Sequence, residues 1–375
     1  MAERSEANSD ISRLLRPELE AMPGYEAIEP PDQLARRLGI PAERIIKLDG
    51  NENPYGPSPK ALKALAEYRD YHIYPDPLQH EAREALSRFL GIPFDQIVFG
   101  TGSDEIMDLV LRAFLTPGDG VVNCPPTFGM YPFLTRVAGA RLIEVSRCED
   151  DFSLDLTAIR AIAGEAKVIF VASPNNPTGN VISKAELDAL LSTGLVVVLD
   201  EAYVEFAGGS FVGRVAEGGN LIVLRTFSKW AGLAGLRVGY GVFPPSVAEV
   251  ILKIKQPYNL NVAAQAAMLA SLEDADLLRE HVRMLVTERE ELLRALAAVP
   301  FVEPLPSQAN FILCRFEGID TGRLQEELRQ RGIMVRRPDS PVLSDCLRIS
   351  VGLPEHRRAL IEALNEIGGS LGASR

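Results

Sequence analysis

The strongest constraint on this chain is an alternation of short apolar runs with helical-period segments that begins near residue 95. The apolar runs lie at 97–99, 120–123, 142–145, 168–172, 195–199, 221–224 and 238–243. Segments of helical periodicity, such as 104–115 and 184–191, separate many of them. Short continuous runs of Val, Ile and Leu with intervening helices are typical of a parallel sheet covered on both faces. The pattern therefore predicts an α/β domain on a mostly parallel, seven-stranded sheet.

After Pro257 the pattern changes to that of a smaller domain. A long helix is expected over 277–296, and shorter helices over 324–329 and 355–367. Strands are expected at 311–314, 333–335 and 347–351. A chain of 375 residues also suggests two domains. We therefore predict an N-terminal arm over 1–45, a large domain over 46–255 and a small α+β domain over 256–375.

The composition excludes several classes of protein. A net charge of −12 argues against a nucleic-acid binder. The sequence contains no run of 18 consecutive apolar residues, so it predicts no membrane span. The N-terminus has no apolar core of a signal peptide. Four cysteines and four histidines show no metal-ligand spacing, which predicts no metal site. Unpaired, reduced cysteines favour a cytoplasmic protein.

Five loops that follow predicted strands carry the candidate chemistry. Loops after parallel strands meet at the carboxyl edge of a sheet, where ligands bind. Here they are polar, aromatic or glycine-rich, and they cover 100–105, 124–131, 173–179, 200–203 and 226–229. The first leads straight into a helix, and free amides at a helix N-terminus form an anion site. Taken alone, each loop is equally compatible with a structural turn or a helix cap.

Lys229 and Asp200 are the most informative of these residues. Lys229 lies just beyond a buried run, where a lowered pKa would let its amine form a Schiff base with a carbonyl cofactor. Nearby hydroxyls and an arginine would donate to a phosphate. Asp200 ends a fully apolar run, and a buried carboxylate requires a partner, such as a protonated pyridine nitrogen.

The motifs together resemble the aminotransferases among the pyridoxal-phosphate enzymes of fold type I, and within them the histidinol-phosphate aminotransferase family. Asn-Glu-Asn-Pro-Tyr-Gly at 51–56, Tyr-Pro-Asp-Pro at 74–77 and Asp-Glu-Ala-Tyr-Val-Glu-Phe at 200–206 carry this resemblance. So do Ser-Pro-Asn-Asn-Pro-Thr-Gly at 173–179, Arg-Thr-Phe-Ser-Lys at 225–229 and Cys-Leu-Arg-Ile-Ser-Val-Gly at 346–352. The resemblance covers about residues 20 to 370.

The resemblance implies a role for each matching residue. Lys229 would hold pyridoxal 5'-phosphate and shuttle protons, with Asp200 on the pyridine nitrogen, Tyr203 and Asn176 on the ring oxygen, and Phe128 stacked on the ring. The expected phosphate cup is Ser103, Asp104, Thr226, Ser228 and Arg237, with Tyr74 reaching in from a partner subunit of a homodimer. Arg348 would bind the substrate anion, Asn176 would also contact the substrate, and Arg336 and Tyr25 would bind a substrate phosphate. Since neighbouring strand residues point to opposite faces, only one of Arg336 and Arg337 should face the site, and we predict Arg336.

The implied reaction is transfer of the amino group of L-histidinol phosphate to 2-oxoglutarate, a step of histidine biosynthesis that gives imidazole acetol phosphate and L-glutamate. An aromatic-amino-acid aminotransferase and a threonine-phosphate decarboxylase of the same fold share most of these motifs. They keep the same cofactor residues, so the sequence leaves the preferred amino donor open. A non-catalytic ligand-binding module would be expected to lack Lys229, Asp200 or Arg348, and all three are present.

Overall fold

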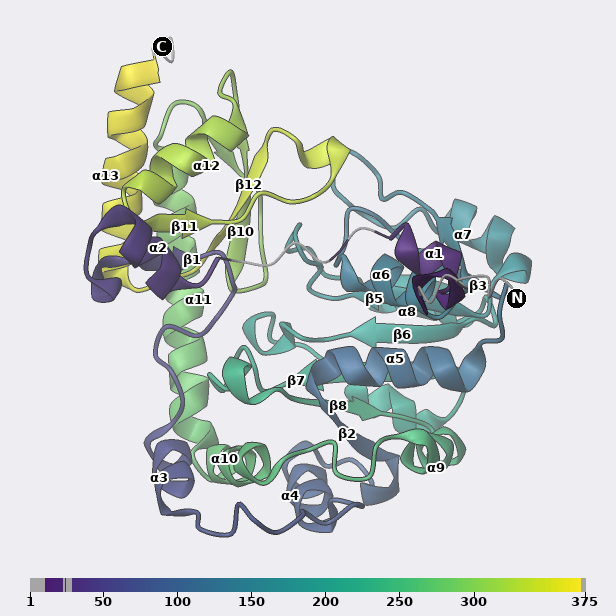
Figure 1. The fold of residues 1–375 in the computed structure, drawn as a ribbon. Helices are drawn as coiled ribbons and strands as arrows, with labels where there is room; N and C mark the ends of the chain where they lie inside the picture. The colour runs from purple at the N-terminus through teal and green to yellow at the C-terminus, as the bar shows by residue number, and fades with distance from the viewer. Residues whose placement is uncertain (1–10, 23, 25–28, 372–375) are drawn as a thin grey trace, which may run out of the picture.

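The computed structural model, which describes residues 11–22, 24 and 29–371, centres on one large sheet (Figure 1). Its strand order is β2-β8-β7-β6-β5-β3-β4, and β8 runs antiparallel to the other six. The predicted, mostly parallel, seven-stranded sheet is confirmed. The strands are β2 (Ile97–Thr101), β3 (Gly120–Asn123), β4 (Arg141–Glu144), β5 (Val168–Ala172), β6 (Val196–Asp200), β7 (Leu221–Thr226) and β8 (Val238–Val242).

Helices cover both faces of this sheet because its central strands are apolar on both sides. Val168 and Phe170 pack with the helices α5, α6 and α9, whereas Ile169 and Val171 belong to a larger core on the opposite face. That larger core continues into the small domain. The helices of this part are α3 (Pro59–Glu67), α4 (His80–Leu90), α5 (Gly102–Phe114), α6 (Met130–Val137), α7 (Leu156–Ile162), α8 (Lys184–Leu191), α9 (Pro245–Ile254) and α10 (Val262–Glu273).

The small domain is built on the long helix α11 (Ala275–Ala297) and two small sheets (Figure 1). One sheet is antiparallel, with β10 (Phe311–Phe316) between β9 (Val302–Pro304) and β12 (Cys346–Ser350). In the other, β11 (Ile333–Val335) runs parallel to β1 (Ile46–Leu48). The helices α12 (Thr321–Gln330) and α13 (Pro354–Leu371) complete the domain, and α2 (Pro31–Leu38) lies beside it. The expected strands and helices beyond Pro257 are therefore confirmed.

The strands β1 and β9 were not predicted. Strand β1 pairs with the small sheet, although the sequence analysis assigned residues 46–48 to the large domain. The domain boundaries at 45 and 255 stay predictions. Short 3-10 helices occupy several connections: η1 (Ile11–Leu14), η2 (Ala42–Arg44), η3 (Phe94–Gln96), η4 (Ala163–Glu165), η5 (Val204–Phe206), η6 (Val212–Glu217), η7 (Ala234–Leu236) and η8 (Pro341–Leu343).

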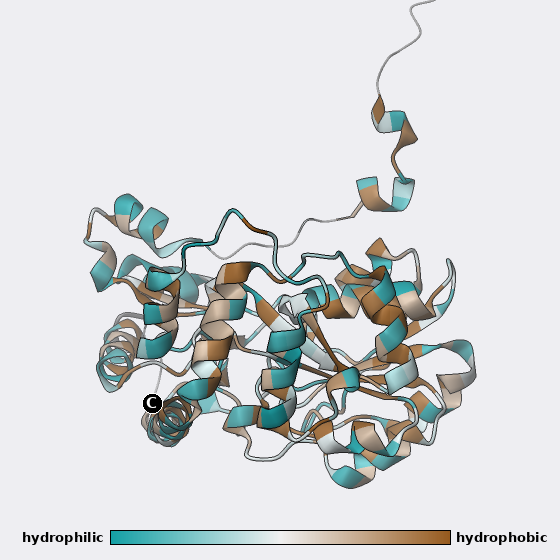
Figure 2. Ribbon diagram, turned by 90° about the horizontal axis from the view of Figure 1, so that it is seen from below, coloured by the Kyte–Doolittle hydropathy of each residue, from teal (hydrophilic) through white to brown (hydrophobic). Residues whose placement is uncertain are grey.

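The first described part of the N-terminal arm, residues 11–22, projects from the rest of the chain (Figure 2). It carries η1 and the short helix α1 (Pro17–Glu20), and Arg16 donates to the Val137 carbonyl at the end of α6. Ile11, Leu14 and Leu15 are exposed on it. Within the described ranges, no helix is long and apolar enough to cross a membrane.

Candidate active site

The ends of three adjacent parallel strands bring the predicted residues together. Pairing aligns Ala172 of β5 with Asp200 of β6, and Asp200 with Leu224 of β7. The loops after these strands therefore start side by side at one edge of the sheet. They carry Asn176, Asp200, Tyr203, Thr226, Ser228 and Lys229.

Asp200 is buried and receives two hydrogen bonds from neutral donors. The Tyr131 hydroxyl donates to its Oδ2 at 2.7 Å, and the Ala202 amide donates to Oδ1 at 3.0 Å. Burial raises the pKa of Asp200 to about 6, although the Tyr131 hydrogen bond opposes that rise. A cation placed against this carboxylate would lower its pKa again and stabilise its ionised form. The arrangement therefore suits a positively charged ligand group.

Lys229 is half-buried and its amine donates to the Gly50 carbonyl at 3.1 Å. Burial lowers the pKa of Lys229 to about 8, and the nearby positive charges of Arg348 and Arg237 add to this effect. The amine is thus far more nucleophilic near neutral pH than an ordinary lysine. It also lies near enough to Asp200 for its charge to lower the pKa of that carboxyl.

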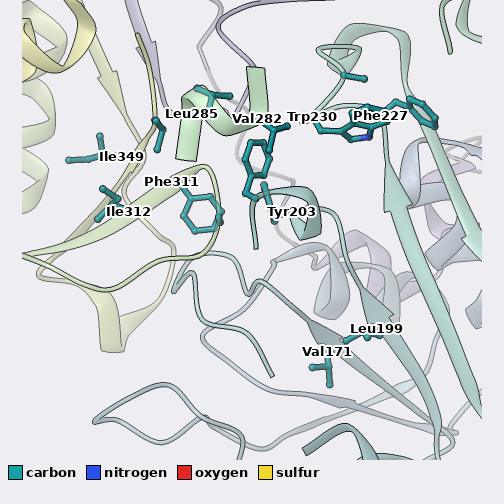
Figure 3. Close-up of a cluster of buried hydrophobic side chains, with 14 of the residues drawn as sticks. Val171, Leu199, Tyr203, Phe227, Trp230, Val282, Leu285, Phe311, Ile312 and Ile349 are labelled. Atoms are coloured by element: carbon teal, nitrogen blue, oxygen red, sulfur yellow. The ribbon is translucent and has the colours of Figure 1, made fainter. Parts of the chain in front are cut away.

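Tyr203 lies where the large and small domains meet. Its ring packs edge-on against Phe311 of β10, with 5.1 Å between the centroids (Figure 3). Its hydroxyl accepts a hydrogen bond from the Asn51 side-chain amide at 3.0 Å. Burial raises the pKa of Tyr203, so the phenol stays protonated at neutral pH.

Arg348 of β12 reaches from the small domain to the strand-end loops. Its Nη1 donates to the Asn176 side-chain oxygen at 2.7 Å, and its Nη2 donates to the Asp49 carbonyl. The guanidinium also lies over the Phe311 ring, 5.4 Å from its centroid. The structure therefore brings Arg348 and Asn176 into direct contact, as a shared anion site requires.

Arg336 pairs directly with Arg348 through an antiparallel bridge. Two backbone hydrogen bonds of 3.0 and 2.7 Å join them, so their side chains lie on the same face of the strands. Arg337 is exposed and its guanidinium lies near Gly322 at the start of α12. This geometry supports the choice of Arg336 over Arg337. A cavity of about 390 Å³ borders both Arg336 and Arg337, with Asp49 and Gln325 in its lining, so the cavity itself does not distinguish the two arginines.

The residues predicted to form a phosphate cup gather around the first turn of α5. Gly102 donates its amide to the Arg237 carbonyl at 2.8 Å, and Arg237 Nη2 pairs with Asp104 at 2.9 Å. Gly239 lets β8 approach this turn, because a Cβ there would lie 2.2 Å from the Ser103 nitrogen. The cup thus combines helix amides with a guanidinium, which is a suitable anion site.

Two hydroxyls complete the cup from β7. The Thr226 and Ser228 side-chain oxygens lie 2.9 Å apart, and both residues are buried. The Thr226 hydroxyl also lies 3.1 Å from the Val238 carbonyl at the start of β8. These contacts fix both hydroxyls close to the start of β8, which directly follows Arg237.

Two of the predicted residues lie against aromatic rings, and a third falls outside the described residues. Phe128 is half-buried and packs edge-on against Tyr131, with 5.6 Å between the centroids. Tyr74 is 78% exposed, and among the described residues its ring stacks on Tyr258 at 4.5 Å. Tyr25 lies outside the described residues. In the described ranges, no group of three or more His, Cys, Asp or Glu residues is placed to hold a metal ion.

Sequence reasoning missed Tyr131 and Asn51. Tyr131 ends the segment 124–131 that the sequence analysis predicted as a loop, but the structure places it in α6, whose packing brings it to Asp200. Asn51 belongs to the Asn-Glu-Asn-Pro motif, and its contact with Tyr203 spans 152 residues of chain. Position in a motif was the only signal that pointed to Asn51.

Comparisons with known proteins agree with this geometry. The model of the family "Aminotransferase class I and II" matches residues 43–364. The histidinol-phosphate aminotransferase of Roseiflexus castenholzii is 49% identical over 369 residues, which cover 96% of this chain and 99% of that protein. The chloroplastic enzyme of the same name from Nicotiana tabacum is 47% identical and covers 93% of this chain and 86% of its own.

A solved structure is similar over nearly the whole chain. It is histidinol-phosphate aminotransferase from Sinorhizobium meliloti in complex with pyridoxal-5'-phosphate. The TM-score is 0.86 at 30% sequence identity, over 95% of this chain and 98% of that one. This chain and that enzyme therefore share the same fold over nearly their whole lengths.

Proposed function

The chain belongs to the class I and II aminotransferase family, and on that premise we propose that its amino donor is L-histidinol phosphate. The amino group passes to 2-oxoglutarate, and the products are imidazole acetol phosphate and L-glutamate. The contact of Arg348 with Asn176 beside Lys229 supports aminotransfer, and the observation that carries the choice of histidinol phosphate is Arg336, which lies on the same face as Arg348. Relatives that share 45–49% of its residues over 96% of the chain carry the name of this activity.

The residues of the site fit pyridoxal phosphate. Lys229, with its pKa near 8, can hold the aldehyde carbon covalently. Asp200, buried and contacted by neutral donors, can hold a proton on the pyridine nitrogen. When bound, the cofactor supplies an electron sink for the bond that breaks at the substrate Cα. Once released, the Lys229 amine can take up and return the Cα proton.

The other contacts are part of the same proposal. Tyr203 and Asn176 hold the ring oxygen, and Phe128 packs against the ring. The first turn of α5, at Ser103 and Asp104, holds the cofactor phosphate together with Thr226, Ser228 and Arg237. The proximity of the Gly102 and Arg237 backbones supports this cup.

Two arginines on one face explain how a single site accepts both substrates. A carboxylate of glutamate needs one arginine fork, which Arg348 supplies. A phosphate ester offers more oxygens and more charge, so a second donor is useful. Arg336, on the same face as Arg348, and Tyr25 are the proposed partners of that phosphate.

We also propose a cytoplasmic homodimer in which each site receives Tyr74 from the partner. The exposure of Tyr74 in the single chain supports the proposal, because a phosphate ligand needs a sheltered position. The arm that carries Tyr25 is proposed to reach the partner's site in the same way.

A panel of amino donors tests the substrate. With 2-oxoglutarate as acceptor, kcat/KM should be highest for L-histidinol phosphate and lower for phenylalanine, tyrosine and histidine. A preference for phenylalanine would replace the substrate but keep the aminotransferase. Release of CO2 from threonine phosphate would indicate the decarboxylase instead.

A further inference from the structure

The segment 49–51 links both domains to the site through its backbone and one side chain. The Asp49 carbonyl accepts from Arg348, and the Gly50 carbonyl accepts from Lys229. Asn51 adopts a left-handed backbone with φ of 52°, which asparagine tolerates better than most residues. Its side chain is 1% exposed and lies between Tyr203 and Ser350.

The hydrogen bonds around Asn51 have a fixed direction. The Asn51 backbone amide can only donate, and it donates to the Ser350 hydroxyl oxygen at 2.9 Å. Ser350 is 2% exposed, so its own proton needs an acceptor, which is the Asn51 Oδ1 at 2.8 Å. With Oδ1 occupied, Asn51 presents its NH2 group to the Tyr203 oxygen at 3.0 Å.

The opposite orientation of the Asn51 side-chain amide would break this chain of hydrogen bonds. Turned by 180°, the Asn51 NH2 would face a Ser350 oxygen that already accepts a hydrogen bond. The buried Ser350 proton would then lose its acceptor, which costs about 1–3 kcal/mol. The Asn310 amide donates to the Asn51 carbonyl at 3.0 Å and holds this backbone in place.

We propose that Asn51 and Ser350 are positioning residues that direct the Tyr203 proton into the active site. Because Tyr203 accepts from Asn51, its O–H is left to donate to the phenolic oxygen of pyridoxal phosphate. The inference rests on the proposed function, since it assigns a direction to a contact of that cofactor. The inference concerns the direction of the Tyr203 hydrogen bond, whereas the proposed function concerns the transfer of the amino group.

Absorbance titration of the bound cofactor against pH tests this direction. A donor to the phenolic oxygen stabilises its negative charge, so loss of the donor lets the Lys229–cofactor linkage keep its proton to higher pH. Tyr203→Phe should raise the pKa of the linkage by about one to two units. Asn51→Asp presents only acceptors to Tyr203 and should raise it by a similar amount.

A double variant separates direction from charge. If Asn51 acts through Tyr203, Asn51→Asp should cause no further shift in the Tyr203→Phe background. An equal shift in both backgrounds would mean that the new carboxylate acts directly, and would overturn the proposal. So would an Asn51→Asp protein that titrates like the wild type while Tyr203→Phe shifts.

A second pair of variants keeps the test decisive if Asn51→Asp does not fold. Ser350→Ala removes the proton that orients the amide, and should shift the pKa in the same direction by a smaller amount. Ser350→Thr keeps a hydroxyl and should titrate like the wild type. An equal pKa of the Lys229–cofactor linkage in Ser350→Ala and Ser350→Thr would contradict the proposal. A wild-type protein that binds no pyridoxal phosphate would instead contradict the proposed function.

Discussion

At the scale of single residues, the predictable part of the site is the part that breaks an apolar pattern. Lys229 and Asp200 stand out because a charged group directly after a buried strand needs a partner. Tyr131 and Asn51 do not stand out, because a tyrosine in an amphipathic helix and an asparagine in a loop are ordinary. Their contacts with Asp200 and Tyr203 join chain segments 69 and 152 residues apart. Only the packed structure brings those groups together.

The lowered pKa of Lys229 predicts how cofactor loading depends on pH. Burial, and then Arg348, lower the pKa to about 8, so half of the amine is neutral near pH 8 and the neutral fraction levels off only above about pH 9. The rate at which apoenzyme binds pyridoxal phosphate should follow this curve, measured by absorbance from pH 6.5 to 10. Arg348→Gln should move the midpoint upward, because a neighbouring positive charge is lost.

A free amine provides the control for this loading experiment. The reaction of pyridoxal phosphate with Nα-acetyl-lysine should keep accelerating to about pH 10, where an ordinary lysine titrates. An enzyme whose loading rate also rises through pH 10 would contradict the lowered pKa of Lys229.

Arg336 should distinguish a substrate phosphate from a plain side chain. Arg336→Ala should lower kcat/KM for histidinol phosphate more than for phenylalanine. Loss of a charged hydrogen bond, about 1.5–3 kcal/mol, corresponds to roughly tenfold to hundredfold. Arg337→Ala is the matched control and should leave both values near wild type. Equal losses for the two donors in Arg336→Ala would remove Arg336 from phosphate recognition.

At the scale of elements, a recurring apolar pattern decides which strands the sequence reveals. The strands of the large sheet were predictable because mostly apolar runs of three to six residues recur, many with helical-period segments between them. Strands β1 (Ile-Lys-Leu) and β9 (Val-Glu-Pro) are three residues long with a charged residue at the centre, whereas the equally short β11, which was predicted, is wholly apolar (Ile-Met-Val). The partner of β1 also lies far along the chain, since Ile46 pairs with Ile333. Short strands of this kind are defined by tertiary pairing.

The close approach of β8 to the first turn of α5 makes Gly239 a sensitive position. A Cβ there would lie 2.2 Å from the Ser103 nitrogen and 2.3 Å from the Gly102 carbonyl carbon, both backbone atoms. Gly239→Ala should therefore displace the phosphate cup, weaken cofactor binding at least tenfold and cost about 1–3 kcal/mol of stability. Cofactor titration and thermal unfolding measure the two effects.

Gly213 provides the matched control for this substitution. A Cβ at Gly213 meets nothing within 4 Å, so Gly213→Ala should keep both cofactor affinity and melting temperature. If Gly239→Ala bound pyridoxal phosphate as tightly as Gly213→Ala does, the cup would not depend on this backbone contact.

At the scale of the whole molecule, the exposed apolar side chains around Tyr74 favour a partner. Tyr71, Ile73, Tyr74 and Tyr258 are each 43–78% exposed, and Tyr74 stacks on Tyr258. A cluster of exposed apolar side chains usually marks an interface. A second copy of the chain related by a twofold axis would cover this cluster on both subunits.

Mixed dimers test whether the two sites are shared. Chains with Tyr74→Phe and chains with Lys229→Ala should each be weakly active or inactive. In a mixed dimer with shared sites, one site carries both defects and the other carries neither. Random mixing at 1:1 puts half of the dimers in this state, so about a quarter of wild-type activity should return.

The control uses two defects that lie in one chain's site. Lys229 and Arg237 belong to the same chain's site, since both approach the loops after β6 and β2 of that chain. Mixing Lys229→Ala with Arg237→Gln chains should therefore restore nothing, because each site of the mixed dimer keeps one defect. If Tyr74→Phe and Lys229→Ala also failed to complement beyond the parent activities, Tyr74 would act within its own chain. The exposed Tyr74–Tyr258 pair would then have to fold back toward its own phosphate cup, and the dimer would no longer be needed to complete the site.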